Sequence, residues 1–319
     1  MLHSEGCNGF AGRAFFDGGP DAHGVVAVAL GPDSTMHGPT AMTRLLRVGL
    51  LSAFTASLLA LERRRRARAY VEHIGRHTGR NLVIAGVAAC TVQALEIPVV
   101  MPLARLVTRR HWGLVRGGAG SWQRDLAAVL LLDYTLYLWH RLAHHVPFLW
   151  RFHLAHHVDL DLDATTGLRF HAGELAASVP WRAAQIVAIG VSPRTLTAWQ
   201  SLTLASILFH HSNVRLSPGA DGVLSWLIAT PTMHAIHHSI DPAQLQTNFS
   251  SGLTVWDRLH GTFRLDARPQ DVVVGVLGHL DRKTATLGTF LTLPFADPAG
   301  ARPAPEGSSR RAAAGRNTG

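Results

Sequence analysis

Histidines at helical spacing are the feature that most constrains this chain of 319 residues. Twelve of its twenty histidines lie between His140 and His238. Eleven of these twelve fall into four groups, which are HRLAHH from His140, HLAHH from His153, the pair His210–His211, and HAIHH from His234, and His171 stands alone. Positions i, i+3 and i+4 of an α-helix share one face, so HLAHH and HAIHH each present their three histidines on one side of a helix, and His140 and His144 share a face in the same way.

Three such faces, packed around a common point, supply enough imidazoles for two metal ions with coordination positions left open. The eight residues on these faces are His140, His144, His153, His156, His157, His234, His237 and His238. His145 falls about 140° from His140 on a helical wheel, so we expect His144 to be the ligand. Imidazole binds a metal as the neutral base, which its ordinary pKa of about 6.5 allows at neutral pH. Nitrogen ligands suit iron, zinc, copper and nickel, so ligand type alone does not name the metal.

Carboxylates near these groups are candidates to orient the imidazoles, because a metal-bound imidazole usually donates its second N–H to a carboxylate or carbonyl oxygen. Asp133 lies seven residues before His140, two helical turns away and therefore on the same face. Asp257 lies beyond the last histidine group. We expect these two aspartates to be the partners, since Glu174, three residues after His171, has an ordinary interpretation as a cap. A plain helix cap stays open for either aspartate.

The composition indicates a membrane setting. Apolar residues make up 47% of the chain and charged residues 16%, compared with roughly 25% charged residues in an average soluble domain. The net charge of +9 is carried almost wholly by arginine, in short runs such as Arg63–Arg66 that lie between apolar stretches. Such runs suit a lipid headgroup surface, and their lack of interleaved aromatic residues argues against nucleic-acid binding. Cys7 and Cys90 are the only cysteines, which excludes a disulfide framework or a CxxC metal site.

We therefore expect an all-α integral membrane protein with about four transmembrane helices. The expected spans cover residues 45–61, residues 82–107, residues 126–139 extended by HRLAHH, and a hairpin of 175–191 and 196–209 that either spans or re-enters. Pro98 and Pro102 should kink the second span. Arg63–Arg66 mark the cytoplasmic side, and this topology places every histidine group on that side.

The chain is expected to form one domain between two disordered ends. Residues 1–40 are rich in Gly, Asp and Pro, and residues 296–319 are a basic tail with little to bury. A membrane catalytic domain would occupy residues 41–295, with 222–230 as a buried or interfacial helix. Met36 and Met42 leave the true translation start open.

Several linked motifs in this domain resemble the fatty acid hydroxylase and sterol desaturase superfamily, over about residues 125–265. The motifs are the run from Asp133 to Glu174 with HRLAHH, PFLWRFH, HLAHH and LRFHAGE, then His211-Ser-Asn213, Pro231-Thr-Met-His-Ala-Ile-His-His, Asn248, and Trp256-Asp-Arg followed by Gly261-Thr262. One departure follows Asn248, where Phe249-Ser250-Ser251 replaces the family's usual aromatic–glycine pair.

The resemblance implies the ligand set His140, His144, His153, His156, His157, His211, His234, His237 and His238. His210 stands at a place where the family often has another residue, so it ranks below His211. His171 matches a recurrent family position. The resemblance leaves open whether it has a structural role or is an additional residue of the metal site. Asn213 and Asn248 belong to the matched motifs.

The resemblance also implies an activity. Its members are membrane enzymes with two iron ions that use O₂ to hydroxylate or desaturate fatty acyl chains, sterols or related lipids on the cytosolic side. Zinc is able to replace the iron during purification. The chain has no HPGG haem motif, no GxGxxG and no cysteine set for an iron–sulfur cluster, so a separate ferredoxin or cytochrome with its reductase should supply electrons.

The alternative is a membrane zinc-binding or other metal-binding protein, either a transporter or a hydrolase. A transporter should place its ligands near the bilayer midplane, whereas these histidines lie at helix ends. A hydrolase should carry a carboxylate base within its histidine motif, as in HExxH, and none is present.

Overall fold

The computed structural model describes residues 41–115 and 122–296, and these residues are helical, with three isolated β-bridges and no strand. The prediction of an all-α chain is confirmed for this part. The predicted disorder of 1–40 and of the tail from residue 297 lies outside the described residues, and the translation start that Met36 and Met42 leave open stays untested.

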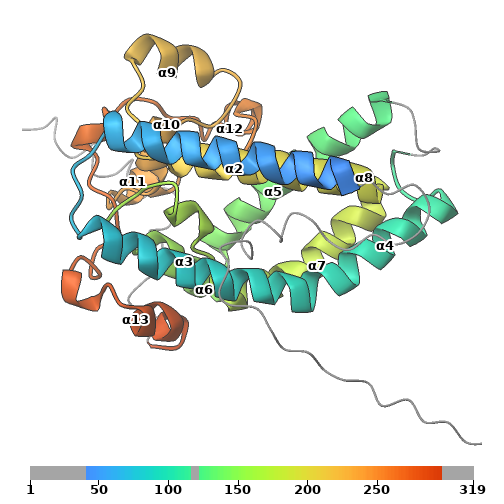
Figure 1. Cartoon of the computed structure of the whole chain (residues 1–319), viewed down its shortest axis with the longest axis horizontal. Coiled ribbons are helices and arrows are strands. Elements are labelled where there is room, and N and C mark those ends of the chain that lie inside the picture. Colours follow the sequence, from blue (N-terminus) through green and yellow to red (C-terminus); the bar gives the residue numbers. More distant parts are fainter. Residues whose placement is uncertain (1–40, 116–121, 297–319) are drawn as a thin grey trace, which may run out of the picture.

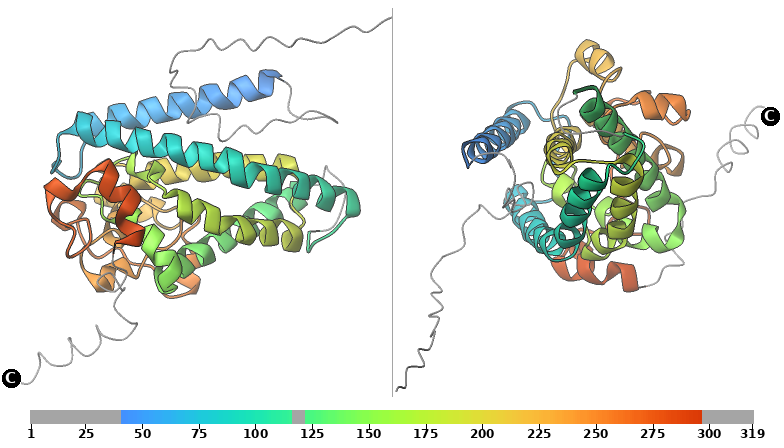
Figure 2. Two further views of the ribbon diagram at one scale, coloured as in Figure 1. Left: turned by 90° about the horizontal axis from the view of Figure 1, so that it is seen from below. Right: turned by 90° about the vertical axis from the view of Figure 1, so that its right-hand side faces the viewer.

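Long helices form a bundle, and short helices gather at one end of it (Figures 1 and 2). The bundle helices are α2 (Ala41–Arg64), α3 (Ile74–Thr91), the π-helical η1 (Val92–Glu96), α4 (Ile97–Arg110), α5 (Trp122–His145), α7 (Ala172–Ile189) and α8 (Pro193–His211). The short α-helices are α6 (Pro147–His157), α9 (Pro218–Leu224), α10 (Pro231–His237), α11 (Pro242–Leu245), α12 (Val255–Leu259) and α13 (Leu287–Thr292). Four 3₁₀ turns complete the list: η2 (Thr166–Leu168), η3 (Pro269–Asp271), η4 (Arg282–Thr284) and η5 (Leu293–Phe295).

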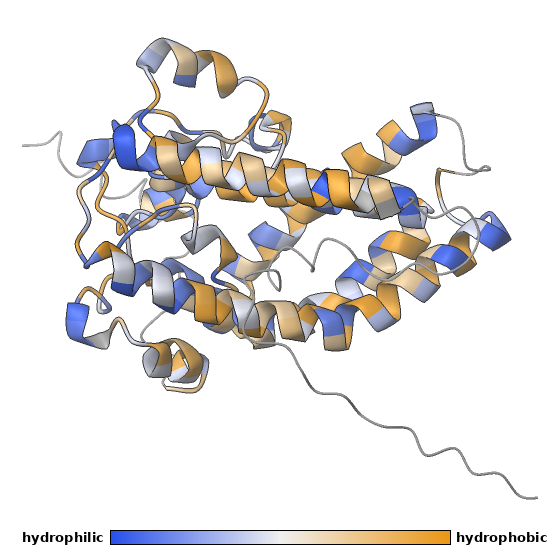
Figure 3. Cartoon of the chain, in the orientation of Figure 1, coloured by the Kyte–Doolittle hydropathy of each residue, from blue (hydrophilic) through white to orange (hydrophobic). Residues whose placement is uncertain are grey.

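Two helical stretches among the described residues are long and apolar enough to cross a membrane, judged by length and composition alone. They are Leu45–Arg64 and Ile74–Arg110. Apolar side chains such as Leu46 and Leu50 lie exposed along the first of them. Hydrophobic residues recur along the whole ribbon of α2 (Figure 3). Both stretches coincide with predicted spans, whereas the predicted spans in α5, α7 and α8 do not meet the same criterion, so the count of four stays a prediction.

The second stretch contains the prolines from which a kink is predicted. The π-helical segment Val92–Glu96 ends two residues before Pro98. Proline has no N–H to donate and its ring crowds the carbonyl four residues earlier, so a wider π turn is a low-cost way to continue the helix. Buried Glu96 pairs there with Arg182 of α7 at 3.2 Å.

The predicted helical hairpin is present, with its turn where the sequence indicates a break. Gly190 ends α7 in the left-handed conformation, at φ 88°, which glycine adopts without the steric cost that a side chain would add. Ser192 then caps α8, its hydroxyl accepting a hydrogen bond from the N–H of Thr195 at 3.1 Å. Pro193 occupies the first turn of α8, where its missing N–H costs nothing.

The largest apolar core joins α4, α5, α7 and α8. Its buried members include Val100, Ala104, Leu132, Ile186 and Trp199. Small residues such as Ala104 let the helix backbones approach closely, which favours association both in water and in lipid. This packing fixes the relative positions of α5 and α8, and both of these helices end at the histidines.

Candidate metal centre

Four helices end at a common point, and each carries its histidines at its C-terminal end. His140 and His144 lie near the end of α5, His156 and His157 end α6, His210 and His211 end α8, and His234 and His237 belong to α10. The C-terminal end of a helix carries partial negative charge, so converging ends favour a cation. Pro147 and Pro231 begin α6 and α10, so the two short helices start where their missing N–H groups cost nothing.

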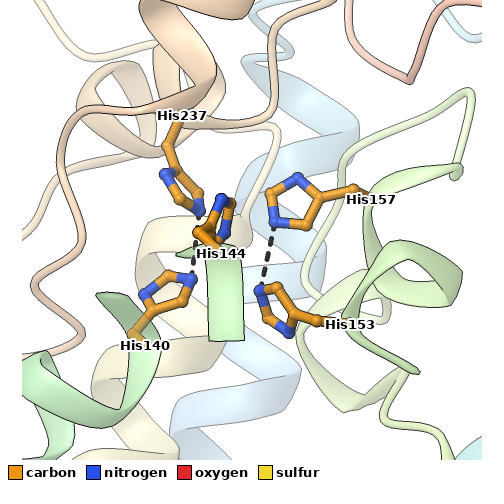
Figure 4. Close-up of side chains that lie close together, drawn as sticks. All are labelled: His140, His144, His153, His157 and His237. Carbon is orange, nitrogen blue, oxygen red and sulfur yellow. Dashed lines mark hydrogen bonds between the residues drawn. The ribbon is translucent and has the colours of Figure 1, made fainter. Parts of the chain in front are cut away.

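The structure brings nine buried histidines together in two groups. Within each group, the ring nitrogens that face a shared metal position all lie within 4.8 Å of one another. The five-histidine group contains His140, His144, His153, His157 and His237 (Figure 4), and the four-histidine group contains His156, His211, His234 and His238. These nine are the residues that the sequence predicts as ligands, and their binding of metal stays a prediction.

The two groups are in direct contact. His157 of the five-histidine group stacks on His238 of the four-histidine group, with ring centroids 4.2 Å apart. His156 and His157 are sequence neighbours that point into different groups, with ring centroids 5.3 Å apart. Two metal positions formed by these groups would therefore be adjacent rather than independent sites.

Hydrogen bonds fix the protonation of five of the imidazoles. A carbonyl or carboxylate oxygen can only accept, so a ring nitrogen bonded to one must carry the proton. The Nδ1–H groups donate as follows: His140 to the carbonyl of Phe249 (2.7 Å), His237 to that of Thr247 (2.7 Å), His211 to that of Ile207 (2.8 Å), His156 to that of Arg169 (3.2 Å), and His153 to Oε1 of Glu174 (2.9 Å). In a neutral imidazole, each Nε2 is then left with a lone pair that points into its group.

The lone pairs of facing Nε2 atoms test whether metal ions fit the two histidine groups. The Nε2 atoms of His140 and His237 lie 3.1 Å apart, and those of His156 and His211 also lie 3.1 Å apart. Two unprotonated nitrogens at this distance repel each other unless a cation lies between them. His144 adds two buried ring nitrogens that have no hydrogen-bond partner among the described residues, which costs about 1–3 kcal/mol if nothing binds them. The donor set therefore fits two nitrogen-ligated metal ions.

Burial keeps the imidazoles in the form that binds metal. Burial lowers the pKa values of His157, His237 and His238 well below the ordinary histidine value, and the neighbouring imidazoles lower them further. Burial therefore favours the neutral imidazole, which is the form that binds metal.

The carboxylate that contacts a ligand imidazole is Glu174, and not Asp133 or Asp257 as the sequence suggests. Glu174 accepts from His153, and the cap of α7 is instead His171, whose Nδ1 accepts from the N–H of Gly173 at 3.0 Å. Asp133 shares a helix face with His140, but seven residues correspond to a rise of about 10 Å, which is beyond hydrogen-bonding reach. Two residues on the same face of a helix can therefore lie too far apart along the helix axis to share a partner.

Asp133 and Asp257 hold the segment that carries the acceptor carbonyls. Asp257 accepts hydrogen bonds from the N–H groups of Phe249 (2.9 Å) and Ser250 (3.0 Å) and from the hydroxyl of Thr262 (2.7 Å). Asp133 accepts from the indole N–H of Trp256 at 2.8 Å and from the N–H of Leu253 at 3.0 Å. Asp133 and Asp257 therefore do not contact the imidazoles, contrary to the prediction, but hold the backbone segment whose carbonyl groups do.

Asn248 and Asn213 position backbone and lie outside both groups. Asn248 adopts a left-handed backbone conformation, at φ 55°, and its amide donates to the carbonyl oxygens of Met233 and Arg264. This conformation presents the preceding carbonyl, that of Thr247, to His237. Asn213 exchanges two hydrogen bonds with the backbone of Arg68, at 2.9 and 3.0 Å, and so ties the end of α8 to the segment after α2.

His145 and His210 also lie outside the two groups. His145 is exposed and donates its Nδ1–H to the carbonyl of Arg141 at 2.7 Å, in keeping with the choice of His144 from the helical wheel. His210 is buried with its ring 4.2 Å from that of His234, beside the four-histidine group but not part of it.

A buried ionic network around Asp159 supports the four-histidine group, and the sequence patterns do not indicate it. Asp159 contacts His77 (3.0 Å), Arg80 (3.3 Å) and Arg169 (3.8 Å), and the Nε–H of Arg169 donates to the carbonyl of Ala155 at 3.1 Å. Burial alone would raise the pKa of the Asp159 carboxyl, but the charges of Arg169 and His77 outweigh it and lower the pKa. Arg169 is thereby fixed, and its carbonyl accepts from His156. His77 and Arg80 stand about eighty residues before Asp159, and no motif links them to it.

These features define a helical protein with two adjacent histidine groups that could hold metal ions. Residues 126–262 match the fatty acid hydroxylase family, which confirms over this region the resemblance predicted from the sequence motifs. The match covers the helices and the segments that carry all nine histidines.

Several known proteins are similar to this chain over the same region. An ornithine lipid hydroxylase, OlsE, of Rhizobium tropici is 32% identical over 151 residues, which is 47% of this chain and 44% of the relative. An alkylglycerol monooxygenase of Xenopus tropicalis is 29% identical over 132 residues, or 41% of this chain and 28% of the relative. A human cholesterol 25-hydroxylase is 26% identical over 152 residues, or 45% and 52%. The chain thus spans between about a quarter and a half of the length of these relatives, and no solved structure matches it significantly.

Proposed function

We propose that this protein is a non-haem di-iron membrane oxidoreductase that uses O₂ to hydroxylate or desaturate a C–H bond of a lipid-like substrate. The observation that carries the proposal is the pair of adjacent, buried, all-histidine groups, whose Nε2 lone pairs converge in each group. No described carboxylate belongs to either group. A carboxylate base of the kind that hydrolytic zinc sites use is therefore missing from the described ligand positions.

The five-histidine group would hold one iron and the four-histidine group the other. When bound, the two irons would supply O₂ activation and the oxidising power to remove hydrogen from an unactivated C–H bond. The protein's own part is to hold neutral imidazoles in one tautomer through the Nδ1–H bonds to carbonyl oxygens and to Glu174. Five nitrogens in one group and four in the other leave the two positions unequal.

Aromatic side chains would keep water away from the centre. Phe249 is buried, and its ring centroid lies 5.6, 5.2 and 5.5 Å from those of His140, His144 and His237. Buried Trp150 lies against His144 at 4.9 Å, and Phe170 stacks on His156 at 5.3 Å. Such an apolar wall protects a strong oxidant from quenching and leaves the substrate as the nearest source of hydrogen.

A lipid substrate is supported by the relatives and by the setting. The relatives named above are hydroxylases or monooxygenases of ornithine lipid, alkylglycerol and cholesterol, which share an apolar body and little else. Their names favour hydroxylation over desaturation. The apolar stretches Leu45–Arg64 and Ile74–Arg110 would place the centre beside a bilayer that supplies such molecules.

We further propose a multi-pass topology with the metal centre on the cytoplasmic face. Glu62, near the arginine end of α2, accepts hydrogen bonds from the N–H groups of Ala164 (2.9 Å) and Asn213 (2.6 Å), which border the histidine segments. The run Arg63–Arg66 therefore lies at the same end as the histidines, where positive charge favours the cytoplasmic side. A separate ferredoxin or cytochrome with its reductase would supply electrons from that side.

The proposal is tested by purifying the full chain in lipid nanodiscs, measuring its metals, and following ¹⁸O₂-dependent oxygen incorporation into lipid extract with a chemical reductant. We expect close to two irons per chain and a lipid product that gains one labelled oxygen atom. Tight zinc without iron, together with no O₂-dependent product after iron reconstitution, would overturn the proposal and favour a metal-binding protein without oxygenase activity. Lipid profiles of cells with and without the gene then identify the substrate.

A further inference from the structure

An exposed apolar surface lies on α9, the turn that follows it, and α12. Its members are Val223 (72% exposed), Trp226 (72%), Leu227 (63%), Val255 (47%) and Leu259 (69%), which we call the α9–α12 surface. Val255 and Leu259 are four residues apart and so share the outer face of α12, whereas Asp257 on the same helix is fully buried. Large side chains gathered in this way on a surface usually contact something other than water.

Hydrogen bonds join the two parts of this surface into one unit. The N–H of Thr254 donates to the carbonyl of Leu227 at 3.2 Å, and its hydroxyl donates to the carbonyl of Ser225 at 2.8 Å. Arg258 donates to the same Ser225 carbonyl at 3.1 Å and holds its guanidinium over the Trp226 ring, 4.0 Å from the centroid. The contacts of Thr254 and Arg258 with the turn therefore hold Trp226 in its exposed position.

The surface lies at the arginine end of α2. Arg66 and Val214 form an isolated β-bridge, and the N–H of Arg215 donates to the carbonyl of Arg65 at 2.7 Å. The helix α9 begins at Pro218, three residues beyond Arg215, and projects from the bundle at that end (Figure 1). If α2 crosses a bilayer, its terminal arginines lie among the headgroups, and so does the point from which α9 leaves the bundle.

Charge complementarity indicates which occupant fits. Arg258 lies over Trp226, Arg63–Arg66 and Arg215 lie at the end of α2 from which the chain leads into α9, and the acidic residue of α9, Asp221, is buried. Tryptophan with arginine beside exposed aliphatic side chains suits the boundary between headgroups and acyl chains, where each part finds a matching environment. An anionic leaflet matches the arginines as well.

We propose that the α9–α12 surface inserts into the headgroup–acyl boundary of the leaflet on the histidine side. The proposal rests on the membrane setting of the proposed function and not on its chemistry. It gives α12 two roles on opposite faces: Val255 and Leu259 contact lipid, while Asp257 holds the Phe249 backbone that accepts from His140. Lipid on the outer face of α12 would then lie one short helix away from the segment that orients the five-histidine group.

Spin-label depth measurements on the full chain in nanodiscs test this. In a Cys7→Ser, Cys90→Ser background, single labels are placed at Val223→Cys and Leu259→Cys, and their collision rates with O₂ and with a water-soluble nickel chelate are compared. Leu50→Cys, 70% exposed on α2, is the lipid reference, and Gln270→Cys, exposed in η3, is the water reference. We expect the ratio of O₂ to nickel accessibility at both test positions to lie above that of Gln270 and towards that of Leu50. Test positions that match Gln270, with Leu50 in lipid, would overturn this inference alone.

The same labels separate the other outcomes. A water-like reading at Leu50 would remove the membrane setting itself and overturn both this inference and the setting of the proposed function. Spin–spin broadening at Val223 with shielding from both relaxants would assign the surface to a second copy of this chain and overturn the lipid assignment. We expect phosphatidylglycerol in place of phosphatidylcholine to deepen the Val223 reading, and an unchanged reading would overturn the role given to the arginines. None of these readouts needs iron or activity, so a failure of the di-iron chemistry leaves them intact.

Discussion

The two histidine groups share a chemistry but are held in place by different parts of the chain. The five-histidine group takes two of its orienting acceptors from the late segment at 247–249 and a third from Glu174. The four-histidine group takes one acceptor from within its own helix, the carbonyl of Ile207, and one from Arg169, which a buried ionic network fixes. The difference teaches that backbone carbonyls orient most of the imidazoles, and that buried charges from distant segments in turn orient the carbonyls.

The supports also differ in their energetic character. Asp257 holds its segment with three hydrogen bonds in a compact loop. Asp159 instead faces Arg80, Arg169 and His77, so its support depends on balanced charges that are out of water. Breaking such a balanced pair by removing one partner leaves an uncompensated buried charge. We expect the two groups to respond differently to substitutions that remove charge but keep shape.

The largest expected effect is the loss of a member of either group. His237→Ala and His156→Ala should each abolish O₂-dependent product, because the chemistry requires both metals. Each should also lower the iron content from two towards one per chain, measured by elemental analysis of the purified protein. The double variant should approach zero. Retention of two irons in both single variants would contradict the assignment of one metal to the five-histidine group and one to the four-histidine group.

Asp159→Asn should come next, acting on the four-histidine group through Arg169. Removing the charge leaves Arg169 and Arg80 partly uncompensated, and breaking a buried pair costs about 3–5 kcal/mol. We expect a correspondingly lower free energy of unfolding and preferential loss of one iron. Asp161→Asn is the matched control in the same segment, since the Asp161 carboxylate accepts from the backbone N–H groups of Val71 and Glu72 and makes no hydrogen bond to Arg169 among the described residues. Equal effects of the two substitutions would contradict the role of the Arg169 contact.

Substitution of Glu174 should have a smaller effect, confined to the five-histidine group. Loss of a carboxylate that orients a metal-bound imidazole typically lowers metal affinity or activity about 10–100-fold. We expect Glu174→Ala to fall in this range when iron retention is titrated against a chelator. Glu174→Gln should recover most of the affinity, because its amide oxygen still accepts from His153. A glutamine variant as weak as the alanine variant would show that the charge, and not the orientation, is what matters.

The smallest expected effect sharpens the choice between adjacent histidines. His145 is exposed and bonded to its own helix, so His145→Ala should leave product formation and iron content close to those of the unsubstituted protein. His144→Ala should lower both, as its two buried ring nitrogens belong to the five-histidine group. The two variants are assayed side by side for iron and product. If they prove equally damaging, the helical-wheel choice of His144 is wrong.

The sequence predicts those features that depend on local periodicity. The i, i+3, i+4 spacing of HLAHH and HAIHH is a property of single helices, and the structure brings the same histidines together. The α7–α8 hairpin follows from Ser192 and Pro193, which act on their immediate neighbours. The prediction of Asp133 as the partner of an imidazole is wrong because a helical wheel does not show distance along the helix axis. Glu174 is not predicted because its partner, His153, lies twenty-one residues earlier in the chain.

Features that depend on tertiary contacts give no local pattern. His77 and Arg80 meet Asp159 only after α3 packs beside the 159–169 segment, and each alone reads as an ordinary polar residue at a helix start. The number of membrane spans is difficult to predict from sequence for the same reason. The helices α5, α7 and α8 bury polar groups such as Gln185 against one another, so their hydropathy does not separate lipid-facing from protein-facing sides.

The position of the acceptor carbonyls has a consequence for how the protein is made. Residues of the five-histidine group begin to leave the ribosome at His140, but the group lacks His237 and the carbonyls of Thr247 and Phe249 until about a hundred further residues have followed. Asp257, which holds that segment, comes later still. Neither group is complete before His237 and His238 have emerged, so metal in the proposed centre would bind late in synthesis or after it, once the last histidine helix has joined the earlier ones.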